Sequence, residues 1–281
     1  MTKLKILALA TLMTGVVVSF PVHAQEEDDI VGYRSGEKSR DKISGYVAGG
    51  VAVFPEYPGS EDYDVVPGVI AKVNYGEYYY AQFMGPELKV NVIRDKKFNF
   101  GPLIGYDGGR DDVENDRVDL LDEVDNGLEL GAFASYAFNE VFHSRDEVEF
   151  ELSAVQDVAS GHEGFIADLD ASYSLPVHFH GTWRLGFSLG ASYVSDDYAD
   201  SYYSISSAES VASTLPTFNA EGGLDTVDAM ITANYLLSNQ WGIFGFAGVE
   251  QLVGDGEDTP ITDIEGDDTS FSGGLALSYR F

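Results

Sequence analysis

The feature of this 281-residue sequence with the clearest chemical potential is a set of carboxylates spaced two residues apart. The set is Glu147, Glu149, Glu151, Asp168 and Asp170. Side chains two apart in a strand share a face, so we expect these carboxylates to line one surface on neighbouring strands. Such a lining favours cations. In the alternative interpretation the surface is packed by polar pairs, in which Arg184 and Arg280 neutralise some of the acids.

Catalysis would require a nucleophile, a base and a group that orients the base. The local cluster worth considering is Asp157, Ser160, His162 and Glu163, which lie on one short connection. A single short turn does not dictate triad geometry. The sequence contains no cysteine, which removes thiol chemistry and Cys-ligated zinc. We therefore predict a protein that is not an enzyme, with no catalytic residues and no cofactor or metal site.

The charge balance excludes one class of partner. Asp and Glu number 47 against 16 Lys and Arg, which gives a formal net charge of -31. This surface repels phosphate backbones, so nucleic acid is not an expected partner. Two acidic runs, residues 107–125 and 255–268, lack calcium-loop spacing and are interpreted as solvated loops. Divalent ions bridging them to lipopolysaccharide phosphates are the alternative.

The first residues indicate export. Lys3 and Lys5 precede an apolar run that ends near Phe20, and a small residue, Ala24, follows. The run is shorter than the ~20 residues that a spanning helix needs. We therefore expect a cleavable signal peptide over residues 1–24 and a periplasmic N-terminal segment over residues 25–42.

The rest of the chain, residues 43–281, alternates apolar and polar residues with a period of two. Alternation alone allows either a soluble sandwich or a membrane barrel. Aromatic residues such as Trp183, Tyr193 and Trp241 at strand ends, and short connections that take turns with long polar ones, favour the barrel. We predict an all-β transmembrane antiparallel up-and-down barrel of about twelve strands, with long extracellular loops and short periplasmic turns. Ten strands remain an alternative, because the run between Tyr75 and Ile93 is broken.

The end of the chain carries a further signal. Leu277, Tyr279 and Phe281 alternate on the last predicted strand and finish on an aromatic residue. This ending resembles the signal that the barrel-assembly machinery reads in bacterial outer-membrane proteins. We therefore expect the outer membrane of a Gram-negative bacterium as the location, with lipid and lipopolysaccharide as surroundings.

Several loop motifs carry a family resemblance. They include Pro55, Tyr57, Gly59, Ser60, Arg110, Gly254, Asp255 and Pro260. With them, the sequence resembles the MipA/OmpV family of outer-membrane proteins over most of its length. It departs from the family pattern at Tyr203, Ile205 and Thr259.

The resemblance implies a scaffold in peptidoglycan biogenesis that links a murein lytic transglycosylase to a bifunctional murein synthase. Docking of periplasmic enzymes would use the N-terminal segment and the short turns that contain Arg94, Lys96, Lys97, Arg145 and Asp146. The alternatives are a porin-like, cation-preferring channel for small solutes and a surface adhesin or stress-response barrel. The residues leave open the partners, any external ligand, the oligomeric state and whether the lumen conducts or is plugged.

Overall fold

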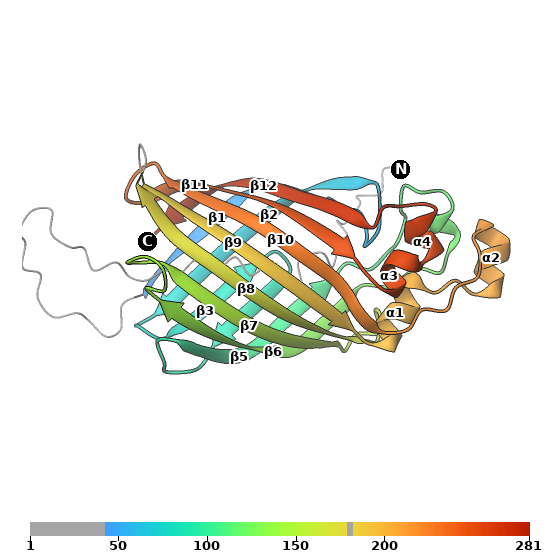
Figure 1. The fold of residues 1–281 in the computed structure, drawn as a ribbon, viewed down its shortest axis with the longest axis horizontal. Coiled ribbons are helices and arrows are strands. Elements are labelled where there is room, and N and C mark those ends of the chain that lie inside the picture. The colour runs from blue at the N-terminus through green and yellow to red at the C-terminus, as the bar shows by residue number, and fades with distance from the viewer. Residues whose placement is uncertain (1–42, 179–181) are drawn as a thin grey trace, which may run out of the picture.

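The computed structural model describes residues 43–178 and 182–281, and the expected signal peptide and N-terminal segment lie outside them. Twelve antiparallel strands of the described residues form a closed barrel in which each strand pairs with its neighbours in sequence and β1 pairs with β12 (Figure 1). The strands are β1 (Ile43–Pro55), β2 (Tyr63–Tyr75), β3 (Tyr79–Met84), β4 (Glu87–Asn91), β5 (Phe98–Asp107), β6 (Gly127–Asn139), β7 (Glu147–Asp157), β8 (Phe165–His178), β9 (Thr182–Val194), β10 (Gly223–Leu236), β11 (Trp241–Leu252) and β12 (Thr269–Arg280). The predicted architecture is confirmed, and the number of strands is twelve rather than ten.

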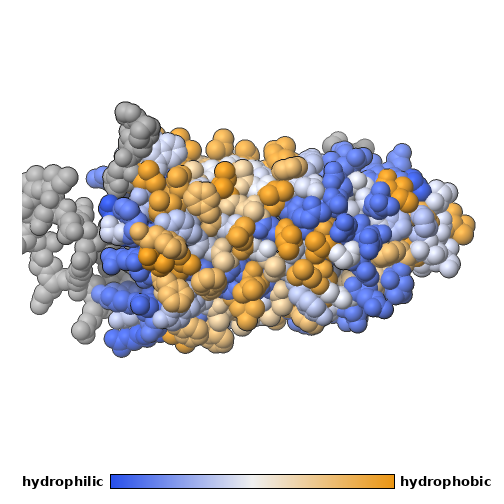
Figure 2. Space-filling model, in the orientation of Figure 1, coloured by the Kyte–Doolittle hydropathy of each residue, from blue (hydrophilic) through white to orange (hydrophobic). Residues whose placement is uncertain are grey.

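The alternation of the sequence explains the orientation of the side chains. In β7, Phe150 and Leu152 are 49% and 57% exposed on the outer wall, whereas Glu151 between them is buried in the lumen. A closed barrel pairs backbone groups between strands, which is what a lipid environment demands. An apolar belt therefore surrounds the barrel between two hydrophilic ends (Figure 2).

Aromatic pairs mark both edges of this belt. At the end that carries the short turns, the rings of Trp183 and Tyr235 lie 4.7 Å apart between centroids. At the opposite end, the rings of Phe165 and Tyr193 stack at 6.0 Å. Aromatic girdles of this kind sit at the two lipid–water interfaces. The short turns and the last strand's end are thus periplasmic, and the long connections are extracellular.

The segment with the weakest strand signal forms a short hairpin. β2 pairs with β3 only over Ile70–Tyr75, so residues 63–69 pair with β1 alone. The fourth strand ends at Asn91. There the Asn91 side chain donates to the Tyr78 carbonyl (2.7 Å) and accepts from the Phe100 N–H (3.0 Å), beside a backbone bond from the Val92 N–H to the Phe100 carbonyl (3.0 Å).

The extracellular connections contain the helical elements. They are η1 (Val118–Leu120), α1 (Asp196–Tyr203), α2 (Ser207–Ser213), α3 (Asp255–Asp258) and α4 (Pro260–Asp263), which gather at one end of the barrel (Figure 1). Within the described ranges, no helix is long and apolar enough to cross a membrane.

Candidate functional site

Four extracellular connections fold over the mouth of the barrel, and we call them the external cap: residues 56–62, 108–126, 195–222 and 253–268. Helix α1 presents Tyr198, Tyr202 and Tyr203, all buried, to the barrel. They share one apolar cluster with side chains of β5, β6, β7, β8, β9 and β11, which are Leu103, Phe133, Val155, Ile166, Val194 and Leu252. Since these six strands span half of the wall, α1 covers the mouth.

A second apolar cluster joins the four cap segments to one another. Its buried members are Tyr57, Val118, Leu121, Ile205, Leu215 and Ile261. Burial raises the pKa of Tyr57 to about 12, so its phenol is neutral at physiological pH. The cap therefore has an apolar core of its own.

Local sequence signals start the cap helices. Ser206 and Glu209 form a reciprocal capping box at the start of α2. Pro260 is the first residue of α4, where its missing N–H costs nothing. Just before it, the Thr259 hydroxyl donates to the carbonyl of Tyr203 (2.7 Å), which ties α4 to the end of α1.

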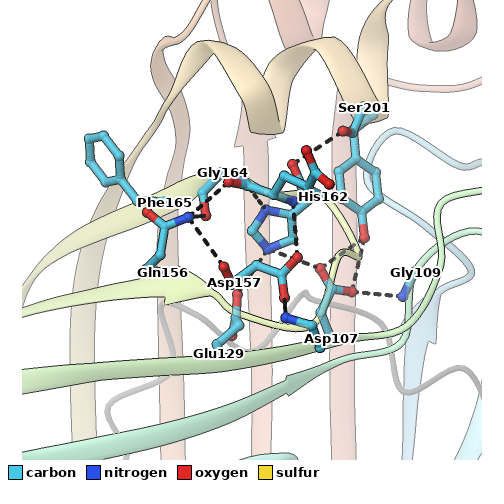
Figure 3. A network of polar contacts seen from close by, with 12 residues as sticks. Asp107, Gly109, Glu129, Gln156, Asp157, His162, Gly164, Phe165 and Ser201 are labelled. Atoms are coloured by element: carbon cyan, nitrogen blue, oxygen red, sulfur yellow. Dashed lines mark hydrogen bonds and ion pairs between the residues drawn. The ribbon is translucent and has the colours of Figure 1, made fainter.

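A buried polar network anchors α1 to the barrel rim (Figure 3). It joins Asp107 at the end of β5, Glu129 near the start of β6, His162 from the β7–β8 connection and Tyr202 of α1. The Tyr202 hydroxyl donates to the carboxylate of Asp107 (2.9 and 3.0 Å). The His162 Nε2 lies 3.3 Å from Glu129 Oε1 and 3.6 Å from Asp107 Oδ2. We call these four residues the rim network.

The histidine tautomer limits what the rim network can bind. The Gly164 N–H donates to His162 Nδ1 (3.1 Å), so in the neutral ring the proton is on Nε2, facing the two carboxylates. The ligand atoms of Asp107, Glu129 and His162 lie within 4.8 Å of one another, close enough for a metal. However, Nε2 could coordinate a metal only after moving its proton to Nδ1 and breaking the Gly164 bond. These residues therefore fit a structural anchor better than a metal site.

Arg110 forms hydrogen bonds within the external cap. Its guanidinium donates from Nη1 to the Tyr202 carbonyl (2.7 Å) and from Nη2 to the Asp122 carbonyl (3.2 Å). Burial lowers the pKa of Arg110. The side chain thus joins two cap segments that are distant in sequence.

The structure places all eight residues of the family resemblance at this external end. Gly59 has φ of +86°, and its carbonyl accepts from the Asp267 N–H (3.0 Å). Asp255 Oδ2 accepts from the Glu221 N–H (2.7 Å). Gly254 also has a positive φ, +63°. These motif residues therefore build the cap rather than the periplasmic surface.

The five carboxylates expected to share a face lie inside the barrel. Glu147, Glu151, Asp168 and Asp170 are buried and Glu149 is half-buried, on the inner sides of β7 and β8. The cation that pairs with them most closely is one that sequence reasoning missed. Lys89 of β4 forms ion pairs with Glu151 and with Glu87 (3.1 Å). It was missed because β4 is short and its partner lies 62 residues away.

The two arginines that were expected to neutralise these acids interact with different groups. Arg184 interacts electrostatically with Glu147, as expected. Arg280 interacts with Tyr46 and lies near enough to Arg184 to act on it electrostatically. Its neutralisation of the acids stays a prediction.

Two further carboxylates extend the acidic surface along one cross-strand row. Glu151 pairs with Asp170, Asp170 with Gly190, Gly190 with Asp228, and Asp228 with Glu250. We call these five residues the acidic row, which crosses β7 to β11. The register of β10 and β11 brings Asp228 and Glu250 into it, which alternation within one strand could not reveal.

Another part of the lumen contains an apolar cluster. Met84 of β3 packs with Met230 of β10 and Phe244 of β11 in one buried cluster. Since β3 and β10 lie five strands apart around the wall, these side chains meet across the lumen. Apolar side chains therefore meet across the lumen, and the external cap lies over its mouth.

The cluster Asp157, Ser160, His162 and Glu163 does not assemble into a catalytic arrangement in the described structure. Asp157 accepts from the backbone N–H groups of Ala159 (2.9 Å) and Glu163 (3.0 Å), so it shapes the turn. Ser160 is exposed, whereas His162 points inward to the rim network.

At the periplasmic end, the chain terminus closes the barrel seam. The Phe281 N–H donates to the Gly45 carbonyl and the Gly45 N–H to the Phe281 carbonyl, both at 3.1 Å. Leu277 and Phe281 are each 50% exposed, and Tyr279 contacts Trp241 with ring centroids 5.0 Å apart. Leu277 and Tyr279 of the predicted assembly signal thus lie on β12, and Phe281 directly follows this strand.

A closed barrel of twelve antiparallel strands, with a lipid-facing apolar belt and two aromatic girdles, defines an outer-membrane β-barrel protein. Within this class, the sequence profile of the family described as MltA-interacting protein MipA matches residues 47–281, so the chain belongs to that family. The protein is located in the outer membrane.

Similar proteins agree with this location. The chain is 27% identical over 131 residues to the putative outer membrane protein YiaT of Escherichia coli K12, and equally so to YiaT of E. coli O157:H7. That match covers 47% of this chain and 50% of the relative, so the chain spans about half the length of the curated relatives it matches.

Two solved structures are similar in outline. The NanC porin is 9% identical with a TM-score of 0.42, covering 84% of this chain and 100% of that one. An outer membrane channel from Pseudomonas putida F1 is 12% identical with a TM-score of 0.42, covering 90% and 100%.

Proposed function

We propose that this protein is a non-enzymatic scaffold of the outer membrane that holds a murein lytic transglycosylase, and with it a murein synthase, at the periplasmic surface. Membership of a family named for interaction with a lytic transglycosylase supports the partner. The observation that carries the proposal over a transport role is the packing of side chains across the lumen. The apolar cluster of Met84, Met230 and Phe244 joins opposite parts of the wall, and the external cap lies over the mouth.

The periplasmic turns supply a docking surface of distinct charge. Arg94, Lys96 and Lys97 are exposed on the β4–β5 connection, in a protein that is otherwise strongly acidic. Asp95 fixes this turn by accepting from the N–H groups of Lys97 (2.8 Å) and Phe98 (2.9 Å). A rigid basic turn is suited to an acidic patch on a partner, because complementary charge speeds and orients association.

The test is capture of a purified MltA-type lytic transglycosylase by the immobilised, detergent-solubilised barrel. We expect the variant Arg94→Glu, Lys96→Glu, Lys97→Glu to retain about tenfold less enzyme. The matched control reverses three exposed charges in the cap, Asp111→Lys, Asp119→Lys and Glu123→Lys, and should leave capture unchanged. Equal capture by both triple variants, or none by the native protein, would refute the docking surface.

A second function, a cation-preferring channel, is favoured by the acidic row. Carboxylate linings select cations, and four carboxylates share this row. Single-channel recording in planar bilayers distinguishes the two functions. A steady cation-selective current through the native protein would favour the channel, and silence would favour the scaffold.

A further inference from the structure

Two aspartates from non-adjacent strands face each other inside the lumen. Asp170 of β8 and Asp228 of β10 are both in register with Gly190 of β9, which lies between them. Because Gly190 has no side chain, the two carboxylates converge over it. A Cβ at position 190 would overlap Asp228 Oδ1 and lie 3.0 Å from Asp170 Oδ1. The glycine therefore allows the two carboxylate oxygens to approach each other.

One of these oxygens has no partner in the described structure. Asp170 is 2% exposed, and its Oδ1 accepts no hydrogen bond from the described residues. The same holds for Oδ1 of Asp168, two residues away on the same face. Buried carboxylate oxygens are normally satisfied by donors or cations, since burying an unpaired charge is costly. A ligand that supplies positive charge would satisfy them.

The nearby side-chain cation is already occupied. Lys89 acts electrostatically on Asp170, but its ammonium group is held by Glu151 and Glu87. On the other side, Glu250 pairs in register with Asp228 and adds a further carboxyl group. Acidic side chains therefore outnumber basic ones around Gly190 in the described structure.

We propose that Asp170 and Asp228 bind a divalent cation, Ca²⁺, over Gly190. Ca²⁺ takes six to eight oxygen ligands in flexible geometry and tolerates water among them, which suits two carboxylates on a rigid wall. This cation ties β8 to β10 through the side chains, and the inference does not depend on the scaffold function.

The first test is calorimetric titration of CaCl₂ into the full-length protein, folded in detergent and stripped with EGTA. We expect one saturable site, and the variant Asp170→Asn, Asp228→Asn should weaken it by about tenfold or more. The matched control, Asp116→Asn with Asp119→Asn, removes the same charge from the exposed cap. This control should leave Ca²⁺ binding at Asp170 and Asp228 unchanged. Any binding that the control variant loses belongs to the cap loops.

A second variant separates geometry from charge. Gly190→Ala keeps both aspartates but places a methyl group where their oxygens converge, so it should weaken Ca²⁺ binding to a similar extent. Gly49→Ala is its control, because a Cβ there meets nothing within 4 Å. Folding of each variant is checked by the heat-dependent gel shift of the barrel, and Asp170→Asn alone serves if Gly190→Ala does not fold.

Two results would overturn the inference. One is a folded Asp170→Asn, Asp228→Asn variant that binds Ca²⁺ as tightly as the native protein. The other is a native protein that takes up no Ca²⁺ at millimolar concentration, which would assign the aspartate pair to a shared proton instead.

Discussion

At the scale of single residues, the anchoring of the cap depends on a few buried polar contacts. Tyr202 and Asp107 are both buried. If the Tyr202 hydroxyl is removed, the Asp107 carboxylate loses a hydrogen-bond donor that water cannot replace. The hydrogen bonds from the Tyr202 hydroxyl to Asp107 join the longest cap segment to the barrel rim. Substitutions here should act on the docking of α1 without disturbing the strands.

We expect Tyr202→Phe to weaken the docking of α1. Removing the hydroxyl that donates to both oxygens of Asp107 should cost about 1–3 kcal/mol. Amide hydrogen exchange in α1 should therefore become about tenfold faster or more. The control is Tyr106→Phe, one residue before Asp107 on the lipid-facing side of β5. Unchanged exchange in Tyr202→Phe would show that the apolar cluster alone holds the helix.

The periplasmic turn 140–146 depends on one carboxylate. Burial acts to raise the pKa of Asp146, but N–H donors of Phe142 (2.9 Å) and Val141 (2.7 Å) and the Tyr173 hydroxyl outweigh it. The pKa of Asp146 is therefore below its ordinary value of about 3.9. Its stabilisation of the turn is fully present above that ordinary value and is lost as pH falls through the lowered pKa.

This pH dependence can be measured directly. The amide resonances of Val141, Phe142 and His143 should shift together in an acid titration, with a midpoint below about pH 3.9. Asp146→Asn should abolish the common transition. A midpoint at or above the ordinary value would contradict the role of the backbone donors.

At the scale of elements, the cap is a separate layer added to the barrel wall. Helix α1 packs on the inner side chains of the wall, whereas Val118 of η1 and the residues that flank α2, Ile205 and Leu215, contribute to the cap's own apolar cluster. The wall is stabilised by strand pairing around a complete circle. The cap can therefore be shortened while the barrel still closes.

We expect replacement of residues 196–213, which contain α1 and α2, by a short Gly-Ser linker to open the mouth. The sequence contains no cysteine, so a single Ser153→Cys on the inner side of β7 reports access. A small maleimide added from outside should label it about tenfold faster in the shortened protein. Ser160→Cys, exposed in the β7–β8 connection, should label equally in both proteins. Equal labelling of Ser153→Cys would show that the cap does not limit access.

At the scale of the whole molecule, closure of the barrel joins the two ends of the described chain. The seam between β1 and β12 is completed by the paired bonds of Gly45 and Phe281. In lipid, an unpaired strand edge is costly, so closure is required rather than optional.

Deleting Phe281 should reduce the amount of assembled barrel. It removes the last backbone pair of the seam and the aromatic residue of the assembly signal. The fraction of heat-modifiable protein in the outer membrane should fall several-fold. Phe142→Ala is the control, since Phe142 is a more exposed aromatic residue in a turn, at 79%. Normal assembly after the deletion would mean that the terminal residue is dispensable.

The sequence alone determined the architecture of this protein, because strand alternation, aromatic residues at strand ends and the order of short and long connections can all be seen in local segments. Glu149 and Glu151 lie on one face of the strand and Phe150 on the other, so three residues are enough to show the alternation. When lipid contacts the apolar face, a closed barrel is the stable arrangement. The same pattern placed the carboxylates of β7 and β8 on one face. The loop residues of the sequence also carried the family motifs, but they did not show that these motifs meet in one cap.

Only the tertiary structure decided which residues meet. Asp107 and Tyr202 are 95 residues apart, and Lys89 and Glu151 are 62 apart. Asp170 and Asp228 share one space only because β9 sets the register of the strands on both sides. Such contacts depend on strand register and loop docking, which arise from the closure of the whole chain and leave no periodic signal in any one segment. The rim network and the acidic row are therefore properties of the folded barrel.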